Sequence, residues 1–168
     1  MIGIFFAVAL LIIISRQRER LPLMTFKKMK LVSNDICYGP MPEPDTEVEQ
    51  HLTINEKGQV WFSRYRFGDG FGKYQLIKKE ILYISQEAAG EIMKIANEVL
   101  NDQNDLFVTD VGVWELIATD FSGKETHKSG SLIYGGCEAI DRFCRLIREA
   151  LKRNDLFLMD GGQQIGNQ

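Results

Sequence analysis

One cysteine offers the sharpest catalytic possibility in the sequence. Cys137 lies in the stretch YGGCEA at the predicted start of a helix, where the helix dipole lowers a thiol pKa and favours the nucleophilic thiolate. His127 could act as its base, with Asp110 or Asp120 as the orienting carboxylate, as in a small cysteine-dependent hydrolase. However, His127 falls in a polar turn-and-strand region, and no catalytic motif surrounds the cysteine. The sequence therefore favours a structural cysteine, with Cys137, His127 and Asp120 as the catalytic alternative.

The glycine-rich stretch FGDGFGKY, residues 67–74, raises the possibility of a phosphate loop. Such a loop needs GxxxxGK[ST] between a strand and a helix, and this stretch has another spacing, lacks the hydroxyl residue and precedes a predicted strand. We interpret it as the turn of a hairpin. A weaker functional reading remains, in which Arg64, Arg66 and Lys73 form a basic patch beside an exposed Phe71 for an anionic or protein partner.

Metal and cofactor sites lack the necessary patterns. His51 and His127 are isolated, no HExxH motif is present, and Cys137 and Cys144 belong to one predicted helix that buries Cys144. We expect no metal and no cofactor.

The strands are predicted from residue alternation and turn residues. HLTIN and VWFSRYRF form a hairpin, YQLIKKEILYI a third strand, VGVWELIAT a fourth, and a polar fifth strand ends near SGSLIY. In the second strand Trp61, Tyr65 and Phe67 share one face, which we expect to be the core. Trp114 is also expected in the core, on a neighbouring strand.

Two amphipathic helices follow from apolar residues at steps of three and four. Ser85 caps the first, which runs to about Leu100, and Gly135-Gly136 precede the second. The expected fold is α+β, an antiparallel sheet of about five strands with two helices packed on one face, in the order βββ-α-ββ-α. LFLM, residues 156–159, is a last short strand or a packed tail.

The terminal segments are assigned separately from this single domain of residues 51–160. Residues 1–30 begin with the uncharged MIGIFFAVALLIIIS, which is a short anchor if it is translated and inserts; alternatively, translation starts at Met24 or Met29. Residues 31–50 hold three of the four prolines and are expected to be an extended lead-in, and residues 161–168 a disordered tail.

Charge and cysteine content restrict the partners. Residues 16–30 carry a net charge of +5, so the chain after them carries −8, which argues against nucleic acid as the partner. Three cysteines without a CxxC pair fit reduced thiols in the cytoplasm. If residues 1–15 insert, the positive-inside rule places the domain at the inner face of the membrane.

From about Met29 to Gly161 the chain resembles a group of small uncharacterised bacterial proteins, through CYGP, LTINEKGQVWFSRYRFGDGFGKY, TDVGVWEL, GSL and LIREALKRNDLFLMDG. This resemblance implies a single domain that occurs alone and transfers no functional residue. Because no catalytic set is recognisable, we expect a non-enzymatic interaction or regulatory domain, for example a toxin-neutralising one, with an unidentified protein partner.

Overall fold

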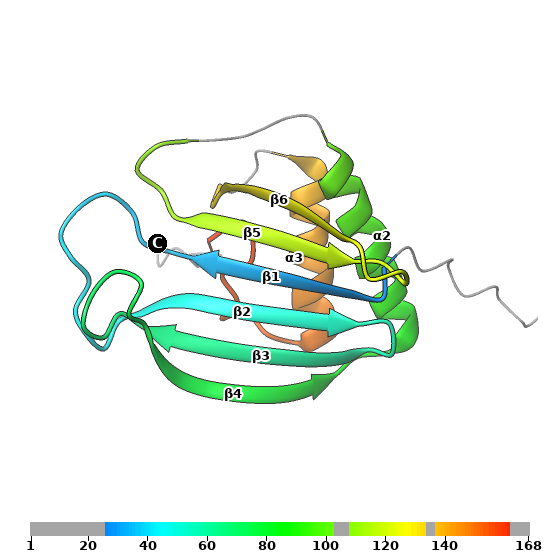
Figure 1. Ribbon diagram of the computed structural model, residues 1–168, viewed down its shortest axis with the longest axis horizontal. Coiled ribbons are helices and arrows are strands. Elements are labelled where there is room, and N and C mark those ends of the chain that lie inside the picture. The colour runs from blue at the N-terminus through cyan, green and yellow to red at the C-terminus, as the bar shows by residue number, and fades with distance from the viewer. Residues whose placement is uncertain (1–25, 103–107, 134–136, 162–168) are drawn as a thin grey trace, which may run out of the picture.

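The structure, a computed structural model, describes residues 26–102, 108–133 and 137–161. Its centre is an antiparallel sheet of six strands in the order β4-β3-β2-β1-β5-β6 (Figure 1). The strands are β1 (Lys28–Asn34), β2 (Glu47–Asn55), β3 (Gln59–Arg66), β4 (Gln75–Tyr83), β5 (Val113–Thr119) and β6 (Glu125–Ser131).

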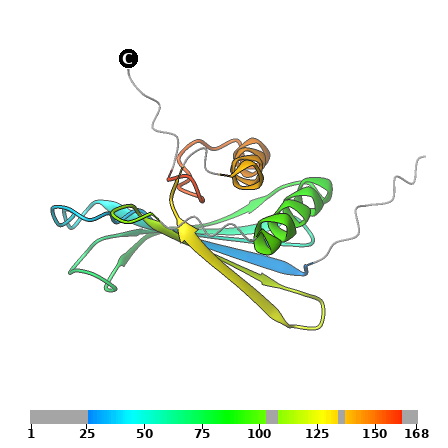
Figure 2. The ribbon, with the colours of Figure 1, turned by 90° about the horizontal axis from the view of Figure 1, so that it is seen from above.

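Helices α2 (Gln86–Asn101) and α3 (Glu138–Leu151) lie on the same side of the sheet (Figure 2). The expected N-cap of α2 is present, since the Ser85 side chain accepts a hydrogen bond from the backbone N–H of Ala88. The α+β class, the antiparallel sheet and the helices on one face are thus confirmed. Within the described ranges, neither helix has the length and apolar composition that crossing a bilayer requires; residues 1–15 lie outside these ranges.

The core fills the space between the sheet and the helices. One residue in two along each central strand points into it, for example Met29 and Leu31 of β1 and Leu52 and Ile54 of β2, all at most 2% exposed. The segment after α3 closes the core as a packed tail without a strand, because Leu156, Leu158 and Met159 are buried there.

The sheet has one strand more than the sequence analysis predicts. This strand, β1, lies at the centre of the sheet between β2 and β5, and it crosses the expected boundary at residue 30. Two lysines of this strand, Lys28 and Lys30, point outward and continue the basic segment that precedes it. They conceal the strand pattern of the inward residues, which are Met29, Leu31 and Ser33. The proline-rich stretch forms the connection to β2 and not a lead-in to the domain.

The prediction that Trp61 is buried is wrong, whereas the prediction that Trp114 is buried is confirmed. Trp114 is 3% exposed, and its indole N–H donates to the Ser131 carbonyl at 3.0 Å. Trp61 is 38% exposed, because β3 turns Val60 and Phe62 to the helices instead. A period of two residues identifies which side chains share a face, and both faces of this strand carry aromatic residues, so the pattern does not select the buried face.

Candidate interaction surface

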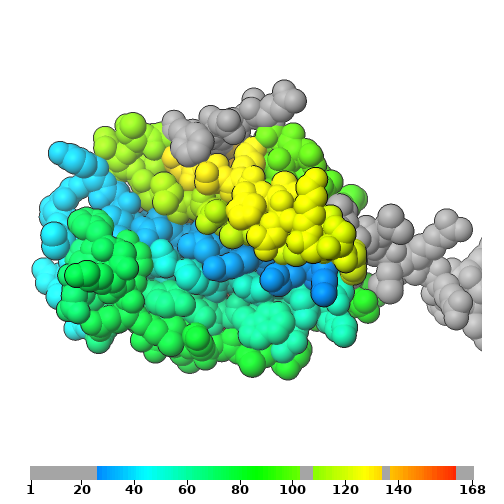
Figure 3. Space-filling model, in the orientation of Figure 1, coloured from blue at the N-terminus to red at the C-terminus, as the bar shows by residue number. Residues whose placement is uncertain are grey.

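One face of the sheet packs against the helices, and no described segment covers the opposite face, which we call the open face. Figure 3 views it directly: the strands, from blue β1 to yellow β6, cross the molecule, and the orange α3 is hidden behind them. An antiparallel sheet with one solvated face normally carries polar side chains there. Departures from that expectation are therefore informative.

Large apolar side chains gather on the β3 and β4 half of the open face. Trp61 pairs across the strands with Ile81, and Tyr65 with Leu76, while Tyr83 lies opposite Gln59. A bulge at Ile77 adds one more apolar residue to β4. The exposed members are Trp61 (38%), Leu76 (48%), Ile77 (47%), Ile81 (57%) and Tyr83 (73%), and we call them the β3–β4 apolar patch. Exposed apolar side chains gathered on one face in this way are typical of an interaction site.

One residue of a charged triplet, Lys79, interrupts the patch in the middle of β4. Lys79 lies opposite Ser63, between the exposed apolar residues on either side. Lys78 and Glu80 point to the helix side, where the Lys78 amine contacts a Glu80 carboxylate oxygen at 2.9 Å.

The β1 and β2 part of the open face carries a polar cluster. Asn34 Nδ2 donates to Glu49 Oε2 at 3.0 Å, and His51 Nε2 lies 2.8 Å from Glu49 Oε1. The Tyr65 ring packs against the His51 ring with centroids 4.6 Å apart. Burial raises the pKa of Glu49, but hydrogen bonds from His51 and Asn34, with the charges of His51 and Lys30, outweigh it and leave this pKa below its usual value. Glu49 is therefore a fixed negative charge at neutral pH.

Beside this cluster the open face is hollowed by an open depression of about 460 Å³. Asn34, Glu49 and Glu115 supply its polar wall, and Val32 and Val113 its apolar wall. A small molecule is usually bound in a deeper, mostly apolar cleft that encloses it. An open depression with polar and apolar walls is better suited to the side chains of a partner protein.

The residues predicted to form a basic patch are not assembled as one. Arg64 faces the helix side and is bonded to Glu47, with Asp155 at 3.6 Å, while Arg66 bonds Asp45 and Gln75. Phe71 is 62% exposed and packs edge-on against the Phe67 ring, with centroids 5.3 Å apart. Lys73 is exposed in the same loop, which connects the antiparallel strands β3 and β4 as the sequence predicts. Because carboxylates occupy both arginines, this end of the sheet offers little free positive charge.

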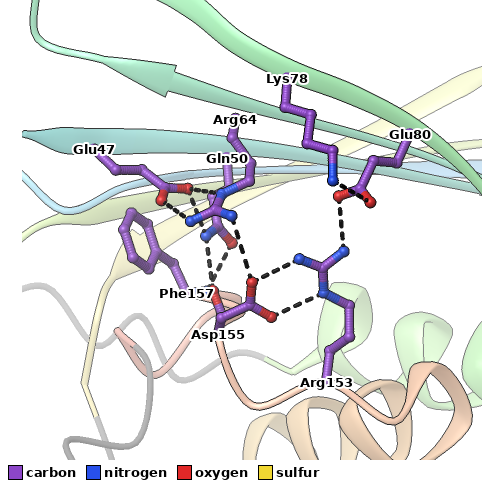
Figure 4. Close-up of polar contacts among 8 residues, drawn as sticks. All are labelled: Glu47, Gln50, Arg64, Lys78, Glu80, Arg153, Asp155 and Phe157. Carbon is purple, nitrogen blue, oxygen red and sulfur yellow. Dashed lines mark hydrogen bonds and ion pairs between the residues drawn. The ribbon is translucent and has the colours of Figure 1, made fainter. Parts of the chain in front are cut away.

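Arg64 belongs instead to a polar cluster that binds the segment after α3 to the sheet (Figure 4). Arg153 contacts Asp155 at 2.6 Å and Glu80 at 2.8 Å, and its guanidinium lies 4.8 Å from the centre of the Phe62 ring. Further along the segment, the side chain of Gln50 donates to the Asp155 carbonyl and accepts from the Phe157 N–H, both at 2.9 Å. We call this group the C-terminal clamp. Its charges are paired with one another, so its role is structural.

The catalytic candidates do not meet. Cys137 contacts Asp102 Oδ2 at 3.2 Å on the helix side of β6, where Lys128 also reaches the Asp102 carbonyl. Because successive strand residues alternate, His127 lies on the open face, with Glu115 at 3.4 Å and Glu125 at 3.5 Å. Asp120 is in the β5–β6 turn, a strand length of roughly 20 Å from the end of β6 that leads to Cys137. Asp110 lies in an exposed turn before β5.

The sequence does not predict that Lys79, Ile81 and Tyr83 belong to a binding surface, nor that Trp61 is exposed on it. The available signal was the pattern QLIKKEILY, in which apolar residues at both strand parities surround a charged triplet. Such charges within an apolar strand are characteristic of a sheet edge.

Comparison of the sequence with protein-family models gives no match, and comparison with curated proteins gives none either.

Proposed function

We propose that this protein is a non-enzymatic interaction domain that binds another protein across the open face of its sheet. The observation that carries the proposal is the β3–β4 apolar patch, in which Ile81 and Tyr83 are more than half exposed with no described segment over them. A toxin that the domain neutralises, or an enzyme that it regulates, is a partner of the appropriate kind. We also propose that the chain belongs to the group of small uncharacterised bacterial single-domain proteins that it resembles.

Nucleic acid is a poor partner for the same face. Glu49, Glu115 and Glu125 lie on it beside outward lysines of β1 and β4, so the face lacks the excess of positive charge that phosphate binding requires. We further propose that the domain works in the cytoplasm. The thiols of Cys37, Cys137 and Cys144 are all free, which supports a reducing compartment.

Site-specific photo-crosslinking tests this function in the native cell. We expect a photoreactive residue in place of Ile81 to form an adduct with a discrete protein, whereas the same residue in place of Lys94, exposed on α2, forms none. The adduct should be lost on Trp61→Ser with the domain still folded by circular dichroism. Equal crosslinking from both positions, or an adduct indifferent to Trp61, would contradict the proposal.

A further inference from the structure

Strand β4 forms one margin of the sheet, and its outer side pairs with no described strand (Figure 1). From Lys78 to Tyr83 it pairs with β3 in uninterrupted register, and the irregularity lies beyond, at Ile77. In a regular edge strand, alternate N–H and C=O groups point away from the sheet and are free to pair with another extended chain. This stretch is therefore a template for one added strand.

The side chains of this stretch set the chemistry of an added strand. On the helix side, Glu80 is already bonded to Lys78 and Arg153, and burial continues at Leu82. On the open face, Lys79, Ile81 and Tyr83 follow one another at steps of two. Lys79 has no hydrogen bond or ion pair among the described residues, so its charge is available to a partner.

A second copy of this chain fits the edge poorly in the two registers that pair most of β4. Two identical strands pair about a two-fold axis, and the antiparallel register that uses all of β4 sets Lys79 of each copy opposite Lys79 of the other. Shifting the centre by one residue sets Glu80 against Glu80. Like charges directly opposite one another destabilise a strand pair. A strand with a carboxylate opposite Lys79 would form a stabilising pair of opposite charges instead.

We propose that β4 accepts an extended segment of a partner protein as a seventh strand, with an acidic side chain opposite Lys79 and apolar side chains opposite Ile81 and Tyr83. Main-chain hydrogen bonds supply affinity, and the alternate side chains supply selectivity. For an antiparallel segment the recognised pattern is apolar-x-apolar-x-acidic. This inference rests on the proposed function and specifies which kind of partner the surface takes.

Two synthetic peptides test the inference on the full chain. Both alternate valine and threonine, and one carries glutamate where the other carries lysine at the position opposite Lys79. We expect the acidic peptide to bind at least about tenfold more tightly in an NMR titration, and to slow hydrogen exchange of the β4 amides. Lys79→Glu should reverse the preference. Lys94→Glu makes the same charge change on α2 and should leave it unaltered.

The outcomes separate the two proposals. If neither peptide binds, if Lys79→Glu leaves the preference unchanged, or if the perturbed amides lie away from β4, strand addition is wrong. Crosslinking from Ile81 would persist in those cases if the open face still binds a protein in another way. Concentration-dependent dimerisation of the unmodified chain with protection of β4 would identify a second copy as the occupant and would also overturn the inference.

Discussion

At the scale of single residues, the two tryptophans differ in the free energy that each contributes. Trp114 is buried and hydrogen-bonded, and a buried aromatic residue replaced by alanine costs about 3–5 kcal/mol. Trp61 is partly exposed on the open face, so Trp61→Ala should cost less than about 1.5 kcal/mol. Urea unfolding of Trp114→Ala and Trp61→Ala measures both values. Losses of similar size would mean that the open face is covered in solution.

Cysteine accessibility gives a second prediction at this scale. Burial raises the pKa of the Cys144 thiol to about 12, and the charge of Asp160 adds to this effect, whereas Cys37 is exposed. Because the thiolate is the reactive form, a thiol reagent at pH 8 should label Cys37 within minutes and leave Cys144 unmodified until the protein unfolds.

Mass spectrometry of proteolytic fragments assigns the labelled cysteine. The variant Cys37→Ser should lose the labelling that is complete within minutes and keep the labelling that follows unfolding. Rapid labelling of Cys144 in native protein would show that α3 separates from the sheet.

Among the elements, the C-terminal clamp should make stability sensitive to acid. Hydrogen bonds from Arg153 lower the pKa of both Glu80 and Asp155 in the folded protein. A carboxylate whose pKa is lower in the folded than in the unfolded protein stabilises the fold fully at a pH above its pKa in the unfolded protein. This stabilisation is lost as the pH falls through its pKa in the folded protein. We therefore expect the urea midpoint to fall as the pH decreases below about 4.5.

The variant Arg153→Gln isolates this contribution. It should be less stable than the unmodified chain at pH 7, and the difference should shrink towards pH 3 as the carboxylates are protonated. Arg142→Gln, which removes a solvent-exposed pair with Glu98 between the helices, is the matched control and should change the pH dependence less. If the difference in stability between Arg153→Gln and the unmodified chain is the same at all pH values, the C-terminal clamp is not the source of the acid sensitivity.

Most elements could be predicted from local pattern, and the exceptions have identifiable causes. The stripes of α2 and α3, the Ser85 cap and the hairpin around residues 67–74 depend on neighbours in sequence. By contrast, β1 belongs to the sheet through β2 and β5, which are distant in the chain, and lysines conceal its pattern. Arg148, a charged residue of α3, is buried because it pairs with Asp160 of the following segment, at 2.6 Å.

The candidate surface was less predictable than the fold. Whether Trp61 or Phe62 faces the helices depends on which side of the sheet the crossover helix α2 occupies, and both faces of β3 carry aromatic residues. Arg64 and Arg66 looked available because their carboxylate partners, Glu47 and Asp45, come from another strand and its preceding loop.

At the scale of the whole molecule, Lys79 should keep the protein monomeric. A charge in an edge strand opposes pairing between copies, and Lys79→Val would join the two parts of the β3–β4 apolar patch into one uninterrupted edge. We expect this variant to self-associate in sedimentation velocity runs. Lys94→Val, which adds the same side chain on α2, should not. A monomeric Lys79→Val would assign the protection of this edge to the bulge at Ile77 instead.

The central place of β1 bears on how the chain is synthesised. The strand leaves the ribosome first, yet its neighbour β5 begins about 80 residues later, a delay of roughly 4–16 s at ordinary translation rates. During that interval β1 to β4 and α2 form at most four of the six strands and one helix. The side of β1 that later receives β5 is unpaired, and the apolar residues that later meet α3 are in water. The nascent protein thus has a second, temporary edge, and chaperone demand should peak there and fall when residue 119 emerges.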